Sequence, residues 1–201
     1  MPKKFSMVYQ FKISLNDVSP PIWRRIQVPE SYTFWDLHVA IQDAMGWLDC
    51  HLHQFEVINP KYGEHDLIGM PDGEWDSEEV FSGWKTPIKR YFSLVNKKAN
   101  YDYDFGDGWR HKILLEKIMP AVPLVEYPIC IAGKRACPPE DCGGPWGYQN
   151  FLEIIANPKH EEYSSMMEWV GGEFHPEIFF VSSVHFDDPK ERLNMCTNVL
   201  G

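Results

Sequence analysis

The feature that most constrains the fold is a segment in which aromatic and acidic residues alternate. Tyr101 to Phe105 places three aromatic side chains on one face of a strand and the carboxylates of Asp102 and Asp104 on the other. Trp109 to Lys117 forms a second strand-like run, and Gly106 to Gly108 between the runs is typical of a β-hairpin turn. The sequence therefore predicts an antiparallel hairpin whose aromatic face packs against the rest of the protein.

The length of the turn decides which residues the two aspartates face. A three-residue loop sets Asp104 opposite Arg110 and Asp102 opposite Lys112, whereas a two-residue loop sets Asp104 opposite His111. The first register gives each aspartate a cation, and such cross-strand pairs stabilise a sheet by roughly 0.2–1 kcal/mol each. We therefore favour the first register, in which both aspartates form structural ion pairs.

The rest of the chain predicts an α+β fold around this hairpin. Residues 6–15 and 22–28 read as two strands, and residues 51–58 as a third. Between them, apolar residues recur at helical spacing from Phe34 to Met45, and Thr33 is a natural N-cap. The order ββαβ, insertion, ββ and helices predicts a mixed, largely antiparallel sheet with a crossing helix. This order is β-grasp-like, with a helical C-terminal part added.

The length of 201 residues suits one domain spanning 1–201. We expect a sheet-rich part over about residues 5–120, with an insertion at 60–87 where turn-forming residues are frequent. A loop rich in Cys, Pro and Gly and a helical part are expected over about residues 128–196.

The charge of the chain bears on its partners. The formal net charge is −10, and phosphate contacts dominate affinity for nucleic acids. An acidic chain without a basic stripe is therefore a poor general nucleic-acid binder. Three short basic clusters are expected to lie on solvated faces: Arg24-Arg25, Lys89-Arg90 and Lys97-Lys98.

The sequence also indicates a compartment. No window approaches the roughly 18 apolar residues that a membrane helix needs, and no apolar run follows the basic N-terminus. The five cysteines are an odd number and do not suggest a disulfide framework. We expect a cytoplasmic protein with reduced thiols and no membrane partner.

Histidine and cysteine residues suggest one candidate metal site. His51 and His53 alternate on one face of a predicted strand, and Cys137 and Cys142 lie in a proline-rich loop. Together these residues offer the mixed nitrogen and sulfur ligands that zinc accepts in tetrahedral sites. The spacing lacks a CxxC pair, so buried cysteines without a metal are the alternative.

Carboxylates suggest a second candidate site. Glu140 and Asp141, together with the hairpin carboxylates and His53, could hold Mg²⁺ or Mn²⁺, which prefer oxygen ligands. A polar site at the hairpin tip would use Asp104, Asp107 and His111. The alternative is ordinary turn chemistry, since an aspartate before a pair of glycines often forms a turn.

Several motifs resemble the Ri-plasmid open-reading-frame-three family, whose members are described as mobile-element passenger or TnpR-like proteins. The similarity covers roughly residues 5–195. The motifs are Tyr9-x-Phe11-Lys12-Ile13, Pro21-x-Trp23-Arg24-Arg25, His51-Leu52-His53-x-Phe55, Tyr103 to Trp109 with His111, and Cys137 to Gly144 with Gly147-Tyr148. The recombinase-like label would imply a serine nucleophile with arginines around a DNA phosphate. No motif in this chain places such a set, so the resemblance assigns no catalytic residue.

These observations lead to three hypotheses. The first is an intracellular module that binds a metal, a small ligand or a protein, with zinc or another divalent ion as the candidate cofactor. Its site would comprise His51, His53, Asp104, Asp107, His111, Glu140 and Asp141. The second is a metal-dependent hydrolase or nuclease that uses the same carboxylates, with His53 or His111 as the base. The third is a DNA-associated recombination accessory protein that uses the three basic clusters. The sequence leaves open whether the protein is an enzyme.

Overall fold

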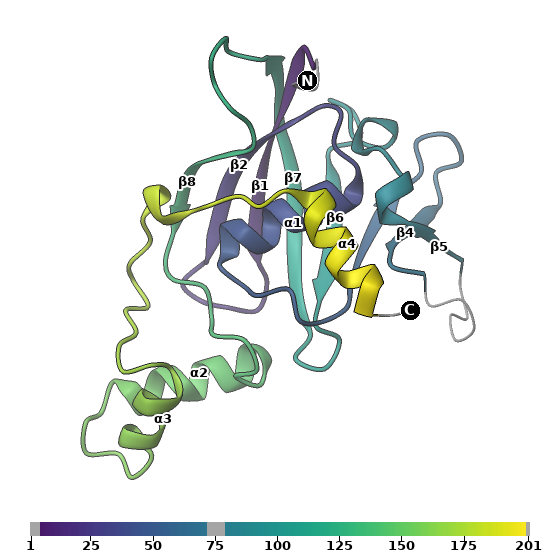
Figure 1. The fold of residues 1–201 in the computed structure, drawn as a ribbon. Helices are drawn as coiled ribbons and strands as arrows, with labels where there is room; N and C mark the ends of the chain where they lie inside the picture. Colours follow the sequence, from purple (N-terminus) through teal and green to yellow (C-terminus); the bar gives the residue numbers. More distant parts are fainter. Residues whose placement is uncertain (1–4, 72–78, 200–201) are drawn as a thin grey trace.

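In the computed structural model, which describes residues 5–71 and 79–199, eight strands form one mixed sheet (Figure 1). The sheet order is β5-β4-β3-β6-β7-β1-β2-β8, and every pair is antiparallel except β4 with β5. The strands are β1 (Met7–Leu15), β2 (Trp23–Pro29), β3 (His53–Ile58), β4 (His65–Gly69), β5 (Val80–Ser82), β6 (Lys98–Tyr103), β7 (Trp109–Pro120) and β8 (Ile129–Lys134). The predicted α+β class with a largely antiparallel sheet is confirmed.

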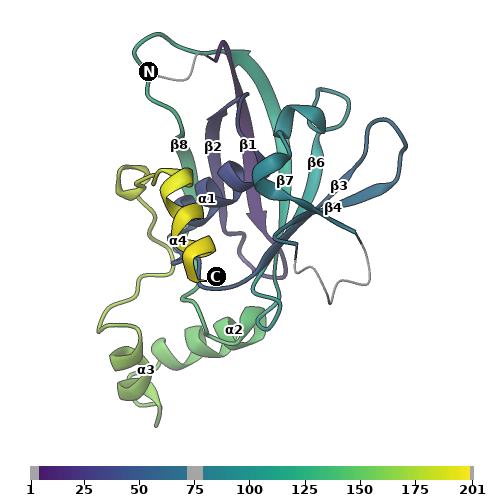
Figure 2. The same cartoon turned by 45° about the vertical axis from the view of Figure 1, so that its right-hand side comes forward.

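The helices divide into two groups (Figures 1 and 2). Helices α1 (Phe34–Met45) and α4 (Pro189–Val199) lie against each other beside the sheet, whereas α2 (Gly144–Ile155) and α3 (Tyr163–Trp169) lie together near one end of it. Three short 3-10 turns complete the described elements: Gly83–Lys85, Ile88–Arg90 and Val181–Ser183. No helix in the described part of the chain is long and apolar enough to cross a membrane.

Helix α1 crosses the sheet as predicted and covers its core face. The Thr33 hydroxyl accepts from the Asp36 backbone N–H, and the Asp36 carboxylate accepts from the Thr33 N–H, so a complete capping box starts the helix. Gly46 ends it with a φ of 93°, a conformation that glycine adopts without steric cost. Phe34 of α1 packs edge-on against Phe55 of β3, with ring centroids 5.1 Å apart. The core therefore lies between α1 and the aromatic face of the sheet.

The hairpin forms, but both predicted registers are wrong. Tyr103 lies opposite Trp109, and Asp102 lies opposite Arg110, so five residues, 104–108, make the loop. Asp104 leaves the strand with a φ of 54°, and its Oδ1 accepts from the backbone N–H groups of Gly106 at 3.0 Å and Asp107 at 3.3 Å. This local capping lengthens the loop, so Asp104 is no cross-strand ion pair.

Two of the predicted segments also supply strands at the edges of the sheet. The expected insertion at 60–87 supplies β4 and β5, which extend the sheet at one edge. The expected helical part at 128–196 begins with β8, which pairs antiparallel with β2 and forms the other edge. Strand β5 has only three residues, and β8 pairs with the distant β2, so local periodicity carries little signal for either edge strand.

Candidate metal centre at the hairpin tip

Three loops meet at the tip of the β6–β7 hairpin: residues 46–52 after α1, residues 104–108 within the hairpin, and residues 135–143 before α2. Each contributes one side chain to a compact polar group. His51 Nε2 lies 3.0 Å from Asp141 Oδ1 and 3.6 Å from Asp104 Oδ2. The three ligand atoms all lie within 4.8 Å of one another. Among the described residues, no other set of three or more His, Cys, Asp or Glu side chains is gathered in this way.

Asp104 is held in place by its own loop. The residue is 8% exposed, and its backbone N–H donates to the Leu52 carbonyl at 2.9 Å. Because Oδ1 accepts from two amides of the hairpin loop, Oδ2 is the carboxylate oxygen that faces His51. The backbone thus fixes which oxygen enters the site.

Asp141 is the third member of the group and is open to solvent. Its side chain is 72% exposed, whereas the side chain of His51 is 30% exposed. Asp141 has a φ of 57°, a left-handed conformation that aspartate and asparagine tolerate better than most residues. The site therefore has one buried carboxylate, one exposed carboxylate and an imidazole close to both.

The Nε2 atom of His51 is excluded from solvent and has no hydrogen-bond partner. It lies close to both carboxylates, but neither contact has hydrogen-bond geometry. Buried polar atoms are normally hydrogen-bonded, and a metal ion at this point would satisfy the nitrogen. One imidazole nitrogen and two carboxylate oxygens are ligands that Zn²⁺, Mn²⁺ and related divalent ions accept. These donors fit a metal ion.

Glu140 is not one of the three clustered residues, but its hydrogen bonds link the loops that carry them. The Tyr103 hydroxyl donates to Glu140 Oε1, and the Leu48 backbone N–H donates to Oε2 at 2.8 Å. The Cys50 backbone N–H donates in turn to the Tyr103 hydroxyl at 3.1 Å. Glu140 therefore joins the loop before α2 to the loop after α1, at residues just before His51.

Asp107 connects the hairpin to the start of α2. Its Oδ2 accepts from the Gly143 backbone N–H at 3.1 Å. At Gly144, which has a φ of 68°, a Cβ atom would lie 2.2 Å from the Asp107 carbonyl oxygen. Only glycine permits this close approach, so Gly144 has a packing reason at this place.

His53 lies in a different cluster from His51. His51 precedes β3, whereas His53 begins it and points into the core, 4% exposed. The ring of His53 stacks on that of His38 with centroids 3.4 Å apart. The two histidines were expected on one face of a strand, but the chain has not yet entered the strand at His51.

His38 and Asp49 are polar core residues that the sequence analysis missed. Gln42 Nε2 donates to the Tyr101 hydroxyl at 2.8 Å, and His38 is hydrogen-bonded to this hydroxyl through Nδ1 at 2.9 Å and to Asp49 through Nε2 at 2.8 Å. Burial lowers the pKa of His38 and of His53 well below the usual value, and burial raises the pKa of Asp49 to about 6. The only sequence signal was the place of His38 within the apolar pattern of the helix.

His111 is a core residue and lies away from the hairpin tip. It shares the inward face of β7 with Trp109, and its Nδ1–H donates to the Tyr101 carbonyl at 3.2 Å. The imidazole packs edge-on against Trp47, with centroids 5.4 Å apart. Burial lowers the pKa of His111 to about 4. Strand alternation explains this placement, because His111 is two residues from the buried Trp109.

The two loop cysteines are not gathered with the histidines. All five cysteines are free thiols, and no described cysteine belongs to the metal-binding group. Cys137 and Cys142 pack against the hydrophobic core, and burial raises the pKa of each thiol to about 12. Trp47 Nε1 donates to the Pro138 carbonyl at 3.0 Å, which anchors this loop over the aromatic core.

Two known proteins without an assigned function are similar to this chain. The chain is 38% identical over 164 residues to the uncharacterized protein y4hQ of Sinorhizobium fredii, covering 82% of this chain and 81% of that one. A crystal structure of a protein of unknown function, MM3350 from Methanosarcina mazei, matches with a TM-score of 0.85 and 51% identity. That match covers 91% of this chain and all of the other. The family model for plasmid pRiA4b ORF-3-like proteins matches residues 7–183, so the chain belongs to this family.

Proposed function

We propose that this protein binds one divalent metal ion through His51, Asp104 and Asp141. The observation that carries the proposal is the solvent-excluded Nε2 of His51, which has no hydrogen bond and lies 3.0 Å and 3.6 Å from two carboxylate oxygens. A metal ion at this point would satisfy the nitrogen and neutralise the repulsion between the carboxylates. The three ligands come from three separate loops, so the ion would also hold the hairpin tip together.

The ligand set favours Zn²⁺, Mn²⁺ or a similar ion over Mg²⁺ held by oxygens alone. Three protein ligands leave at least one coordination position for water or an exogenous ligand, as in zinc sites that are not purely structural. The exposed side of Asp141 is where such a ligand would enter. We therefore expect a metal-dependent ligand-binding module.

The hydrolase alternative has less support. It assigns the base to His53 or His111, and both imidazoles are buried in the core. Neither belongs to the group around His51. An enzymatic mechanism would need a base that is within reach of a metal-bound water. The residues at the tip therefore support metal binding more directly than hydrolysis.

The proposal can be tested by titrating Zn²⁺ and Mn²⁺ into metal-free protein purified without a metal-affinity tag. We expect one ion per chain and a loss of affinity of at least about 100-fold in His51→Ala, since even outer-shell changes cost roughly 10–100-fold. Asp141→Asn should weaken binding in the same direction, because asparagine keeps the shape and tolerates the left-handed backbone.

His65→Ala is the matched control. His65 Nδ1 lies 3.0 Å from Glu56 Oε1, so this variant also removes a histidine–carboxylate contact, but far from the hairpin tip in sequence and on another strand pair. Its metal affinity should equal that of the unaltered protein. Absence of binding in the unaltered protein, or equal losses in His51→Ala and His65→Ala, would contradict the proposal.

A further inference from the structure

The face of the sheet opposite α1 is exposed and has an unusual charge for this protein. Residues directly opposite each other in neighbouring strands share a face. Lys12 lies opposite Arg25 on one side and Leu114 on the other, and Leu114 lies opposite Lys98. Ser14 likewise lies opposite Lys112. These pairs define the open face, whose side chains alternate with the buried residues of the same strands.

Cations gather on this open face. Within the described strands, seven of the chain's 19 lysines and arginines lie on it, compared with three of its 29 acidic residues. The cations are Lys12, Arg25, Lys98, Arg110, Lys112, Lys117 and Lys134. The acidic residues are Glu56, Asp102 and Glu116. An excess of positive charge therefore lies on one face of a chain with a formal net charge of −10.

These cations are not the clusters that the sequence suggested. Arg24 is 1% exposed and donates from Nε to the Ala44 carbonyl at 2.8 Å at the end of α1, whereas its neighbour Arg25 lies on the open face. Strand alternation separates adjacent basic residues and joins cations from different strands. The basic face is thus a product of the fold and has no contiguous signature in the sequence.

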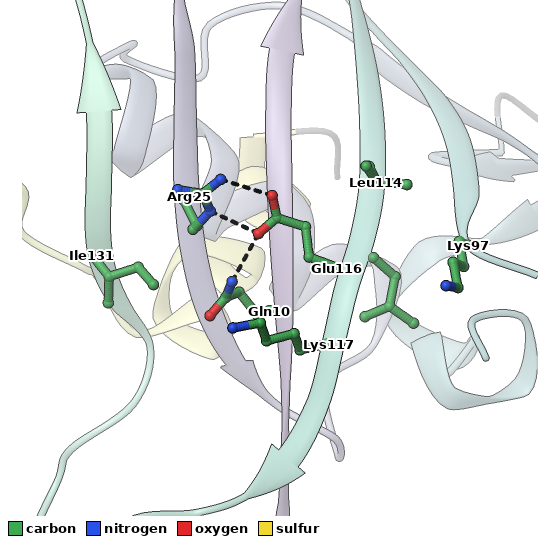
Figure 3. A pocket seen from close by; sticks show the side chains of 8 residues that line it. Gln10, Arg25, Lys97, Leu114, Glu116, Lys117 and Ile131 are labelled. Carbon is green, nitrogen blue, oxygen red and sulfur yellow. Dashed lines mark hydrogen bonds and ion pairs between the residues drawn. The ribbon is translucent and has the colours of Figure 1, made fainter. Parts of the chain in front are cut away.

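A hollow of about 640 Å³ lies in the middle of this face (Figure 3). Arg25, Lys97 and Lys117 line it together with the apolar side chains of Leu114 and Ile131. Figure 3 shows that Arg25, Gln10 and Glu116 point toward one another from three neighbouring strands. Arg25 donates to both Glu116 oxygens, at 2.7 and 2.8 Å, so this pair is held in place while the lysines remain for an outside anion.

An aromatic side chain stands beside the hollow. Trp23 is half-buried on the same face, and the cationic groups of Lys12 and Arg25 each lie 5.1 Å from its ring. Proteins that bind single-stranded nucleic acids combine cations for the phosphates with aromatic or apolar surface for the bases. A broad sheet face suits a single strand, because the grooves of a duplex admit only a helix or a narrow ribbon.

We propose that the open face of the sheet binds single-stranded nucleic acid. The phosphates would contact the lysines of β1, β6 and β7, and bases would lie over the hollow beside Leu114 and against Trp23. The proposed metal centre uses none of these residues, so the two proposals stand or fail separately. The affinity should fall as the salt concentration rises, because it depends on phosphate contacts with the cations of this face. The rest of the protein is acidic and adds no such contacts.

The test is fluorescence anisotropy with a labelled single-stranded oligonucleotide of mixed sequence, measured on metal-free protein across a series of salt concentrations. The test variant carries Lys98→Gln, Lys112→Gln and Lys117→Gln, three exposed residues of the face. The matched control carries Lys85→Gln, Lys89→Gln and Lys159→Gln, which are exposed but belong to no strand of the face. Both variants have the same net charge.

We expect the unaltered protein and the control to bind alike and the test variant to bind at least about tenfold more weakly. The slope of log affinity against log salt should fall by about 2, which follows from roughly 0.7 per lost phosphate contact. A second variant of the face, Arg110→Gln with Lys134→Gln, should change affinity in the same direction. Three results would overturn the proposal: no binding at low salt, equal losses in test and control variants, or equally tight binding of poly-glutamate.

Discussion

At the scale of single residues, Asp104 shows how one backbone conformation changes both a strand and a site. Its left-handed φ of 54° ends β6 and lengthens the hairpin loop to five residues. The same turn directs Oδ1 toward the loop amides and Oδ2 toward His51. The residue is thus structural through one oxygen and available to a metal through the other.

This division predicts different results for two substitutions of Asp104. Asp104→Asn keeps an oxygen for the loop amides and tolerates the left-handed conformation, so the free energy of unfolding should change by less than about 1 kcal/mol. Its affinity for the metal should nevertheless fall, because the charged oxygen is lost. Asp104→Ala should lose affinity and also about 1–2 kcal/mol of stability, because two loop amides lose their acceptor.

Urea denaturation of the metal-free proteins, combined with metal titration, checks this pair. Equal destabilisation by asparagine and alanine would show that Oδ1 does not hold the loop. Full metal affinity in Asp104→Asn would show that the charge of Oδ2 is not needed.

Gly144 predicts an effect of backbone packing on the site. Gly144→Ala places a Cβ atom 2.2 Å from the Asp107 carbonyl oxygen, so the start of α2 has to move away from the hairpin. We expect a loss of about 2–3 kcal/mol in stability and a weaker metal site. Gly143→Ala is the control, since its φ is also positive but its Cβ atom would meet only ordinary contacts at 3.5 Å.

Thermal denaturation and metal titration of both variants test this expectation. The control should lose about 1 kcal/mol from backbone strain alone and keep its metal affinity. If both variants behave alike, the contact between Gly144 and Asp107 has no role beyond conformational strain.

At the scale of elements, α1 and β3 enclose a stacked pair of histidines that should make stability depend on pH. Burial lowers the pKa of His38 and His53 in the folded state, so below the unfolded value of about 6.5 the unfolded state binds more protons. The contribution of these histidines to the free energy of unfolding is then fully present above this pH and is lost as the pH falls. Asp49, with a pKa of about 6, acts in the opposite direction but is a single group against the two histidines and His111.

His53→Phe should reduce this dependence. The substitution removes one proton-binding group whose Nε2 has no hydrogen bond, so the slope of stability against pH below 6.5 should fall by up to about 1.4 kcal/mol per pH unit. Urea denaturation at pH 7, 6 and 5 measures the slope. A flat profile in the unaltered protein, or an unchanged slope in the variant, would contradict this explanation.

The elements also show what the sequence could predict. The capping box and C-terminal glycine of α1, and the alternation in β1 and β2, are local signals and were predicted correctly. The hairpin was predicted but not its register, because Asp104 satisfies loop amides by a hydrogen-bonding choice that alternation does not reveal. Strand β8 depends on pairing with β2, more than 90 residues earlier, and no local sequence pattern predicts it.

At the scale of the whole molecule, the fold gathers residues that the sequence keeps apart. His51, Asp104 and Asp141 come from three loops. All three were among the predicted site residues, but the sequence also included His53 and His111, which the fold takes into the core. A shift of one residue in the register of a strand turns a side chain to the other face of the sheet. The sequence alone therefore could not tell which of these residues enter the site and which enter the core.

The fold also brings together charged residues that are far apart in the sequence. The acidic total predicted a poor nucleic-acid binder, and that total describes the chain as a whole. Strand alternation nevertheless places cations from five strands on one exposed face. Partners respond to the local field of a face more than to the net charge of a chain.

Anomalous diffraction from crystals of the protein loaded with Zn²⁺ would locate the ion at the hairpin tip. We predict one strong anomalous peak at about 2.0–2.2 Å from His51 Nε2, Asp104 Oδ2 and Asp141 Oδ1, the usual distances for nitrogen and oxygen ligands. No peak at the hairpin tip, or a peak at Cys137 and Cys142 instead, would contradict it.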